Sequence, residues 1–140
     1  MIKFLCYINI INKYIFKGVI DMDFFNKTVI ITGAANGIGK GIALHYAMKG
    51  ANVVIADMDE KNGREAASLI KNQGGNAVFV KTDVRQEADI ILLMKTAFQT
   101  FNRIDILINN AGKGLFKSPY ELTLEEWDDL INTNLRSVFI

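Results

Sequence analysis

The stretch Thr28-Val-Ile-Ile-Thr-Gly-Ala-Ala-Asn-Gly-Ile-Gly-Lys40 decides how this chain can fold. Its first five residues form an apolar run that is typical of a strand buried on both faces. A glycine-rich turn follows, and residues 37–49 then have the apolar spacing of a helix. A strand, a glycine-rich turn and a helix in this order cradle a phosphate group, because the N–H groups of the turn and the helix N-terminus point at the anion.

Strand-like and helix-like segments alternate along the rest of the chain. The expected strands are residues 28–32, 52–56, 77–80 and 104–108, and the expected helices are residues 37–49, 61–73, 86–101 and one that starts near residue 123. Thr123 and Glu126 have the spacing of a capping box in this last helix. Strands separated by helices of this length predict parallel βαβ units with right-handed crossovers. We therefore expect an α/β fold with a doubly wound parallel sheet of about four strands.

The composition narrows the possible classes of function. The 140 residues have a net charge of +1 with acids and bases interspersed, which argues against a nucleic-acid-binding surface. One cysteine and one histidine provide neither a disulfide nor the spacing of a metal site, so we predict no metal. These features fit a single domain in a reducing, cytoplasmic compartment.

Residues 1–21 differ in composition from the rest of the chain, since they are rich in Ile, Asn, Lys, Phe and Tyr. Their apolar-leaning run, residues 4–11, contains Asn9 and is much shorter than the ~20 residues of a membrane-spanning helix. No small-residue cleavage site of a secretory signal follows it. We expect an N-terminal extension that is unstructured or upstream of a true start at Met22, rather than an anchor or targeting segment. Residues 22–140 then form the nucleotide-binding domain.

The glycine-rich turn has the spacing Gly-x3-Gly-x-Gly, and an acidic residue, Asp57, closes the second expected strand. In a βαβ unit this position lies near the adenosine ribose of a dinucleotide, where a carboxylate can accept from both hydroxyl groups. The alternative is a solvated turn residue. A P-loop NTPase is excluded, because that motif needs Gly and Ser or Thr at the positions of Ala34 and Gly41.

Three further motifs make the chain resemble the classical short-chain dehydrogenases/reductases. Asp83-Val84 follows the third strand, Asn109-Asn110-Ala111-Gly112 follows the fourth, and Asn134 lies in the last helix. Together with residues 32–39, they follow the order and spacing of the family over residues 23–140. The resemblance implies a Rossmann-like domain that is incomplete after the fourth strand and the helix behind it.

The resemblance also implies roles for individual residues. The ligand would be a nicotinamide dinucleotide, NAD rather than NADP because of the charge of Asp57, and Asn134 would be the catalytic asparagine that binds a water in the proton relay. From the residues alone, Asp83 is an N-cap for the helix that follows, a role that can hold together with cofactor binding. The alternative for Asn134 is a core asparagine with satisfied hydrogen bonds in an apolar stripe. The cofactor-binding residues implied are Gly33, Asn36, Gly37, Ile38, Gly39, Asp57, Asp83, Val84, Asn110, Ala111 and Gly112.

The family also uses a serine, a tyrosine and a lysine four residues after the tyrosine for catalysis. No Tyr-x-x-x-Lys occurs in this sequence. The resemblance therefore implies an oxidoreductase that transfers hydride between a small alcohol and a carbonyl, usually as a homo-oligomer with no membrane partner. We expect this chain to be a truncated form that is inactive by itself. The alternative is a nucleotide-binding or interaction module that does no chemistry.

Overall fold

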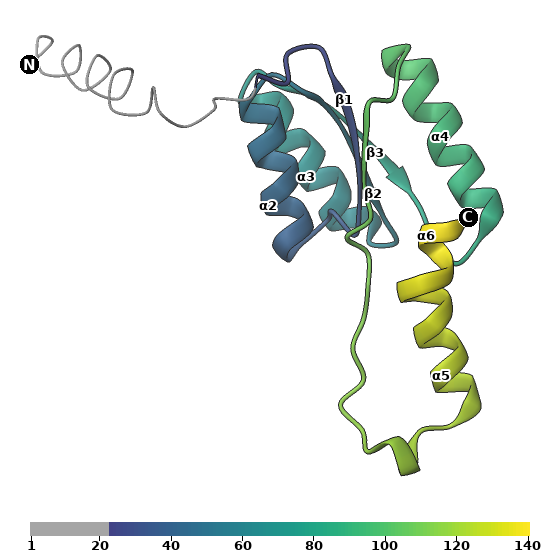
Figure 1. The fold of residues 1–140 in the computed structure, drawn as a ribbon. Coiled ribbons are helices and arrows are strands. Elements are labelled where there is room, and N and C mark those ends of the chain that lie inside the picture. The colour runs from purple at the N-terminus through teal and green to yellow at the C-terminus, as the bar shows by residue number, and fades with distance from the viewer. Residues whose placement is uncertain (1–22) are drawn as a thin grey trace, which may run out of the picture.

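The structure, a computed structural model, describes residues 23–140, so the expectations for residues 1–21 and for Met22 lie outside it. The described residues form one parallel sheet with helices on both of its faces (Figure 1). The expected α/β fold with a doubly wound parallel sheet is therefore confirmed. Within residues 23–140, no helix is both long enough and apolar enough to cross a membrane.

The order of the elements follows the predicted alternation, and the first six agree with their predicted bounds to within one residue. In chain order the elements are β1 (Thr28–Thr32), α2 (Gly37–Met48), β2 (Asn52–Asp57), α3 (Glu60–Asn72), β3 (Asn76–Lys81), α4 (Glu87–Phe101), β4 (Ile106–Ile108), η1 (Pro119–Glu121), α5 (Leu124–Ile131), η2 (Asn132–Arg136) and α6 (Ser137–Phe139).

Two predicted elements differ from those observed. Strand β4 is shorter, because the Thr28 N–H donates to the Asp105 carboxylate at 2.9 Å instead of to a backbone carbonyl, and the ladder with β1 begins only at Ile106. The last helix is not continuous, because the π-helical segment η2 separates α5 from α6. Wider π turns of this kind are frequent at functional sites.

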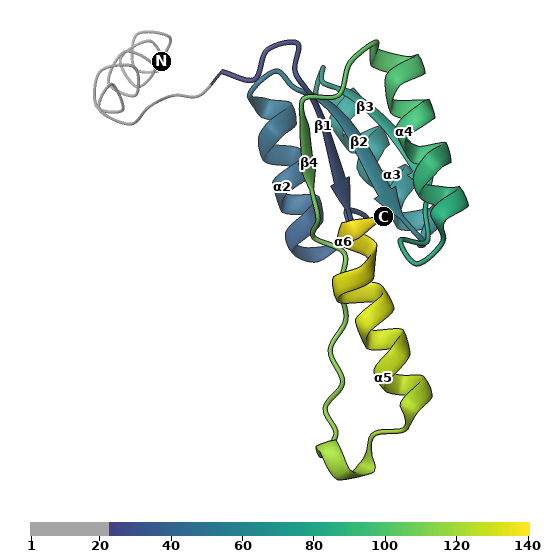
Figure 2. The same ribbon diagram turned by 45° about the vertical axis from the view of Figure 1, so that its right-hand side comes forward.

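The strands are arranged in the order β3-β2-β1-β4, and every neighbouring pair is parallel. Strand β1 is buried along its whole length, as its continuous apolar run predicts. Figure 2 shows the strands side by side, with α6 at their carboxyl ends. Because the strands run in the same direction, the turns that follow them meet at one edge of the sheet.

An apolar cluster packs on each face of the sheet. On one face, side chains such as Ile31 and Ile55 pack with Ile70 of α3 and with residues of α2. On the other face, Ile30 packs with Leu93 of α4. Neighbouring residues of a strand point to opposite faces, so β1 contributes to both clusters. The sheet is thereby fixed between two helical layers, and its carboxyl edge stays open.

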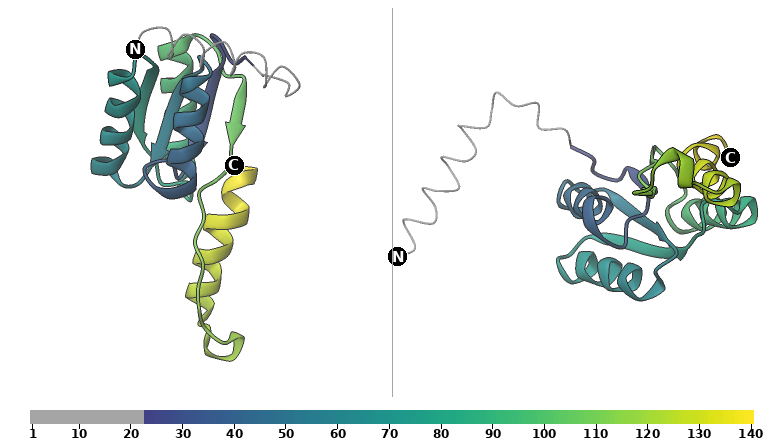
Figure 3. Two further views of the ribbon diagram at one scale, coloured as in Figure 1. Left: turned by 90° about the vertical axis from the view of Figure 1, so that its left-hand side faces the viewer. Right: turned by 90° about the horizontal axis from the view of Figure 1, so that it is seen from below.

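The last part of the chain leaves this core. Figure 3 shows α5 and the segment before it extending past the carboxyl edge of the sheet, and we call residues 113–131 the α5 arm. Helix α5 has no buried residue, and Leu124 and Trp127 are exposed on it. Its start is well defined, since Thr123 and Glu126 form the predicted capping box. The chain then returns toward the sheet through η2 and α6.

We expect Gly63→Ala to destabilise the protein, because a β-carbon at this position of α3 would overlap the ring of Phe79 in β3. Forcing that ring to move should cost about 1–3 kcal/mol of the free energy of unfolding. The matched control is Gly41→Ala in α2, where a β-carbon meets no atom within 4 Å. The control should raise the free energy of unfolding by up to about 1 kcal/mol. Denaturant titrations should give shifts of opposite sign, and a G63A protein of unchanged stability would contradict this packing.

The Asp105 carboxylate fastens the start of β1 to the segment that leads into β4. It accepts hydrogen bonds from the Thr28 N–H and from the Arg103 guanidinium, and Lys27 Nζ lies 3.5 Å away. The hydrogen bond from Arg103, followed by that from Thr28, holds the pKa of Asp105 far below its usual range. A lowered pKa in the folded state stabilises the fold above the unfolded pKa, and the stabilisation is lost as the pH falls.

Asp105→Asn should therefore lower the free energy of unfolding at neutral pH. The difference from the unmodified protein should stay constant down to ~pH 5 and shrink below ~pH 4, where the carboxyl group of the unfolded chain takes up its proton. Urea titrations across this range measure the difference. If it does not vary with pH, the carboxylate is not the group that fastens the two strands.

Candidate functional site

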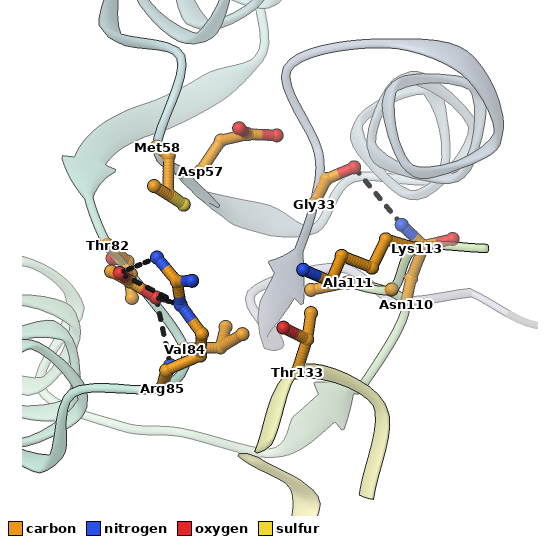
Figure 4. Close-up of a pocket in the computed structure, with 12 residues that line it drawn as sticks. Gly33, Asp57, Met58, Thr82, Val84, Arg85, Asn110, Ala111, Lys113 and Thr133 are labelled. Atoms are coloured by element: carbon orange, nitrogen blue, oxygen red, sulfur yellow. Dashed lines mark hydrogen bonds and ion pairs between the residues drawn. The ribbon is translucent and has the colours of Figure 1, made fainter. Parts of the chain in front are cut away.

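A pocket of about 460 Å³ lies at the carboxyl edge of the sheet, where parallel α/β sheets bind their ligands (Figure 4). Four predicted cofactor residues do not line it: Asn36 is the N-cap of α2, and Gly37, Ile38 and Gly39 are the first three residues of that helix. The predicted residues that line it are Gly33, Asp57, Asp83, Val84, Asn110, Ala111 and Gly112. The structure therefore brings motifs from four separate turns to one place.

The turn after β1 passes so close to the end of β4 that side chains do not fit at two positions. Gly33 has a φ of +64°, and a β-carbon there would stand 2.9 Å from the Cα of Ala111. A β-carbon at Gly39 would overlap the carbonyl oxygen of Gly33. Glycine at both positions is what lets the backbone form this wall of the pocket.

The side chain of Asn110 joins the ends of β1 and β4. Its Nδ2 donates to the carbonyl oxygens of Thr32 at 2.9 Å and Gly33 at 3.1 Å, the second of which is drawn in Figure 4. The Thr32 hydroxyl in turn accepts from the N–H groups of Asn110 and Ala111. These bonds fix the Asn-Asn-Ala-Gly segment against the glycine-rich turn.

The N-terminus of α2 is left without a capping side chain. Asn36 occupies the N-cap position but makes no side-chain cap bond, and the first turn contains no acidic residue. Helices α3 and α5 differ, because Asp59 and Thr123 cap them. Residues 36–38 are exposed, so the first N–H groups of α2 can bind an external anion.

Asp57 lies where β2 ends and lines the pocket. Its Oδ2 accepts from the Ala35 N–H at 2.9 Å, and its Oδ1 accepts from the Asp59 N–H at 3.0 Å. The carboxylate is therefore held against the glycine-rich turn rather than free in solvent, and each oxygen keeps one further lone pair. That arrangement leaves two acceptors for a diol such as a ribose.

Asp83 also lines the pocket, and its carboxylate is held by Arg85. Both carboxylate oxygens accept from the guanidinium, at 2.9 Å from Nε and 2.7 Å from Nη2. These hydrogen bonds lower the pKa of Asp83, which stays ionised. The alternative role of Asp83 as an N-cap is wrong, because α4 begins at Glu87 with Gln86 at its N-cap.

Asn134 lies in η2, outside the pocket lining, and clamps the backbone of Lys113. Its Oδ1 accepts from the Lys113 N–H at 2.9 Å, and its Nδ2 donates to the Lys113 carbonyl at 2.8 Å. The expectation of a buried amide is wrong, since Asn134 is exposed in a part of the helix that extends past the sheet. The amide still has both partners, and it fixes the chain directly after Gly112.

The sequence motifs did not single out every residue of the pocket. The added residues are neighbours of the motifs in the chain, but the motifs do not tell which neighbouring side chains point inward. They are Thr82, Arg85, Lys113 and Thr133, and Met58, next to Asp57, also lines the pocket. Within residues 23–140 there is no group of three or more His, Cys, Asp or Glu side chains that could hold a metal ion.

Comparisons with known proteins match this chain to one family. The profile of the family described as short chain dehydrogenase matches residues 27–140. An uncharacterized oxidoreductase of Thermotoga maritima is 41% identical over 85% of this chain and 47% of its own length. Glucose 1-dehydrogenase 2 of Bacillus subtilis is 38% identical over 84% of this chain and 46% of its own length. The chain thus spans about half the length of the curated relatives it matches.

Solved structures agree with the sequence relatives. A short chain dehydrogenase from Mycobacterium smegmatis has a TM-score of 0.81 at 34% identity, covering 84% of this chain and 50% of its own. The 3-ketoacyl-(acyl-carrier-protein) reductase from Brucella melitensis, solved in complex with NADH, has a TM-score of 0.78 at 36% identity. This match covers 83% of the present chain and 47% of the reductase.

We expect Asn110→Asp to be more destabilising than Asn110→Ala. Alanine leaves two carbonyl groups without a donor and should cost about 1–3 kcal/mol, whereas a carboxylate would face both carbonyls and cost more. The matched control is Asn109→Asp, the same chemical change at the exposed neighbouring residue. Thermal unfolding followed by circular dichroism ranks the three variants. An N110D protein as stable as N109D would show that the amide does not join the two strands.

Proposed function

Because this chain belongs to the short chain dehydrogenase family, we propose that it binds nicotinamide adenine dinucleotide as the cofactor of a hydride transfer between an alcohol and a carbonyl. One observation carries the proposal. The uncapped N-terminus of α2 lies behind a turn that has no room for a β-carbon at Gly33 or Gly39, and the Asp57 carboxylate is fixed beside it. This combination suits a phosphate followed by a ribose.

The residues present fit the parts of such a cofactor. The N–H groups of Gly37, Ile38 and Gly39 suit its pyrophosphate, since they start a helix with no acidic residue in its first turn. Asp57 suits the adenosine ribose through its two remaining acceptors. Asp83 and Val84 suit the adenine, and Asn110 to Gly112 form the opposite wall.

The bound nicotinamide would supply or accept the hydride, and the chain would position it. Asn134 holds Lys113 with one hydrogen bond from each end of its amide, so one lone pair and one N–H remain on that side chain. We propose that this remaining capacity holds a water of the proton relay. The 140 residues contain no Tyr-x-x-x-Lys, so the chain offers no general acid in that pattern.

The proposal also includes the cellular location and the oligomeric state of the protein. We propose a cytoplasmic location, because one cysteine and no metal-ligand spacing suit a reducing compartment. We propose homo-oligomers, because Leu124 and Trp127 on the α5 arm and Phe139 on α6 are exposed and would be covered by a second subunit. A nucleotide-binding module without catalysis would use the same pocket, so turnover with a panel of alcohols and ketones distinguishes the two functions.

We expect the full chain to bind NADH about tenfold or more tightly than NADPH, because the Asp57 carboxylate would repel a 2′-phosphate in the pocket. The double variant Asp57→Ala, Met58→Arg removes this charge and adds a guanidinium beside it, so its preference should shift to NADPH. Glu65→Gln, at an exposed position of α3, is the control and should keep the original preference. Titrations followed by reduced-nicotinamide fluorescence measure all three. Tighter binding of NADPH by the unmodified chain would refute the assignment of Asp57.

A further inference from the structure

Two cationic side chains line the pocket, Arg85 and Lys113, and they differ in how firmly they are held. Every nitrogen of the Arg85 guanidinium donates to a carboxylate, Nε and Nη2 to Asp83 and Nη1 to Asp129 at 2.6 Å. Within residues 23–140, the partner of Lys113 Nζ is Asp129, which it shares with Arg85. An ammonium group has three N–H donors, so Lys113 is the cation that keeps donors for a ligand.

The backbone of Lys113 is fixed, while its side chain is long and flexible. Asn134 binds both the N–H and the carbonyl group of Lys113. The lysine side chain points into the pocket from the side of β4 (Figure 4). A compact ammonium group on a four-carbon stem can turn from one partner to another, whereas a planar guanidinium needs one geometry. Lys113 can therefore change its partner while the wall of the pocket stays in place.

Lys113 also lies close to the glycine-rich turn. Ala111, two residues before it, comes so near to Gly33 that a β-carbon there would stand 2.9 Å from the Ala111 Cα. Two residues span at most about 7 Å of backbone, and the lysine stem reaches further into the pocket. Residues 33–39 contain no basic side chain, and Asp57 holds a negative charge against them. A cation on the opposite wall would offset the repulsion between this carboxylate and a bound diphosphate.

The ion pair between Lys113 and Asp129 is easily given up. Each side chain is 36% exposed, and an ion pair at such a position contributes little to stability. Asp129 would not be left unpaired, because its Oδ1 keeps the hydrogen bond from Arg85 and its Oδ2 is open to water. A diphosphate bears a charge on each phosphoryl group, so it attracts the ammonium more strongly than a shared carboxylate does.

We propose that Lys113 binds the diphosphate of the cofactor, and that its ammonium group exchanges the Asp129 carboxylate for a phosphoryl oxygen when the dinucleotide binds. The inference rests on the proposed function, which places the diphosphate at the start of α2. Asp129 then competes with the ligand for the same cation. Removing the charge of Lys113 and removing the charge of Asp129 should therefore change the affinity in opposite directions.

Fluorescence titrations of the full chain with NADH measure this competition. Lys113→Met keeps an unbranched side chain without the charge, and should weaken binding about three- to tenfold. Asp129→Asn should tighten binding about two- to threefold, because the competing charge is gone. In the double variant K113M, D129N the effect of D129N should vanish, since no ammonium is left to release. The control is Lys117→Met, which removes another ion-paired lysine of the α5 arm and should bind NADH like the unmodified chain.

Competition against NADH identifies the part of the cofactor that Lys113 contacts. ADP contains the diphosphate but no nicotinamide, and adenosine contains neither. K113M should weaken the binding of ADP by about the same factor as that of NADH and leave the binding of adenosine unchanged. The difference between K113M and the unmodified chain should shrink in about 0.5 M salt, which screens the attraction.

The outcomes separate the inference from the proposed function. If D129N weakens NADH binding or leaves it unchanged, Asp129 does not compete with the ligand and the inference fails. It also fails if K113M binds NADH as tightly as the unmodified chain, or if the loss is confined to NADH and spares ADP. In each case the proposed function stands, because the unmodified chain still binds NADH. An unmodified chain that binds neither NADH nor ADP refutes the proposed function, and the inference with it. Circular dichroism checks that the variants fold, and K113M with ADP and adenosine decides the question should D129N not fold.

Discussion

The side-chain amide of Asn110 joins the two strand ends on which the pocket is built. Its two donated hydrogen bonds bring the end of β4 to the turn after β1. That approach leaves no room for a β-carbon at Gly33 or Gly39, and it sets where the backbone of α2 begins. Asp57 then holds the turn from the side of β2. The position of the uncapped helix N-terminus follows from these contacts, since no bond within α2 could fix it.

Much of the fold could be predicted from the sequence because its strands are continuously apolar and its turns carry glycine. Such strands are buried on both faces and alternate with helices, which leaves few possible sheets. Strand β4 was the weakest prediction. Residues 104 and 105 continue the apolar alternation of the strand, but the Asp105 side chain bonds to the backbone of Thr28, a contact between residues far apart in the chain. The π-helical break at Asn132–Arg136 has no local sequence signal either.

Only those residues of the candidate site that belong to a sequence motif could be predicted. The glycines, Asp57 and Asn110 stand at strand ends, and the shared edge of a parallel sheet brings them together. Arg85 and Lys113 could not be predicted in the same way, because long flexible side chains take their direction from partners on other segments. Their common partner, Asp129, lies on a helix whose path past the sheet depends on how Asn134 binds the backbone of Lys113.

The strand order has a kinetic consequence. Contacts between β1 and β2 and between β2 and β3 join residues that are near in sequence, 22 apart for Ala35 and Asp57 and 24 apart for Asn52 and Asn76. The contact between Thr32 and Asn110 spans 78 residues. Closing the longer loop costs about 1 kcal/mol more chain entropy, so β1, β2 and β3 have the advantage in assembling first. Strand β4 then pairs with β1 after β1, β2 and β3 have formed a sheet. The wall of the pocket that β4 supplies is therefore completed last.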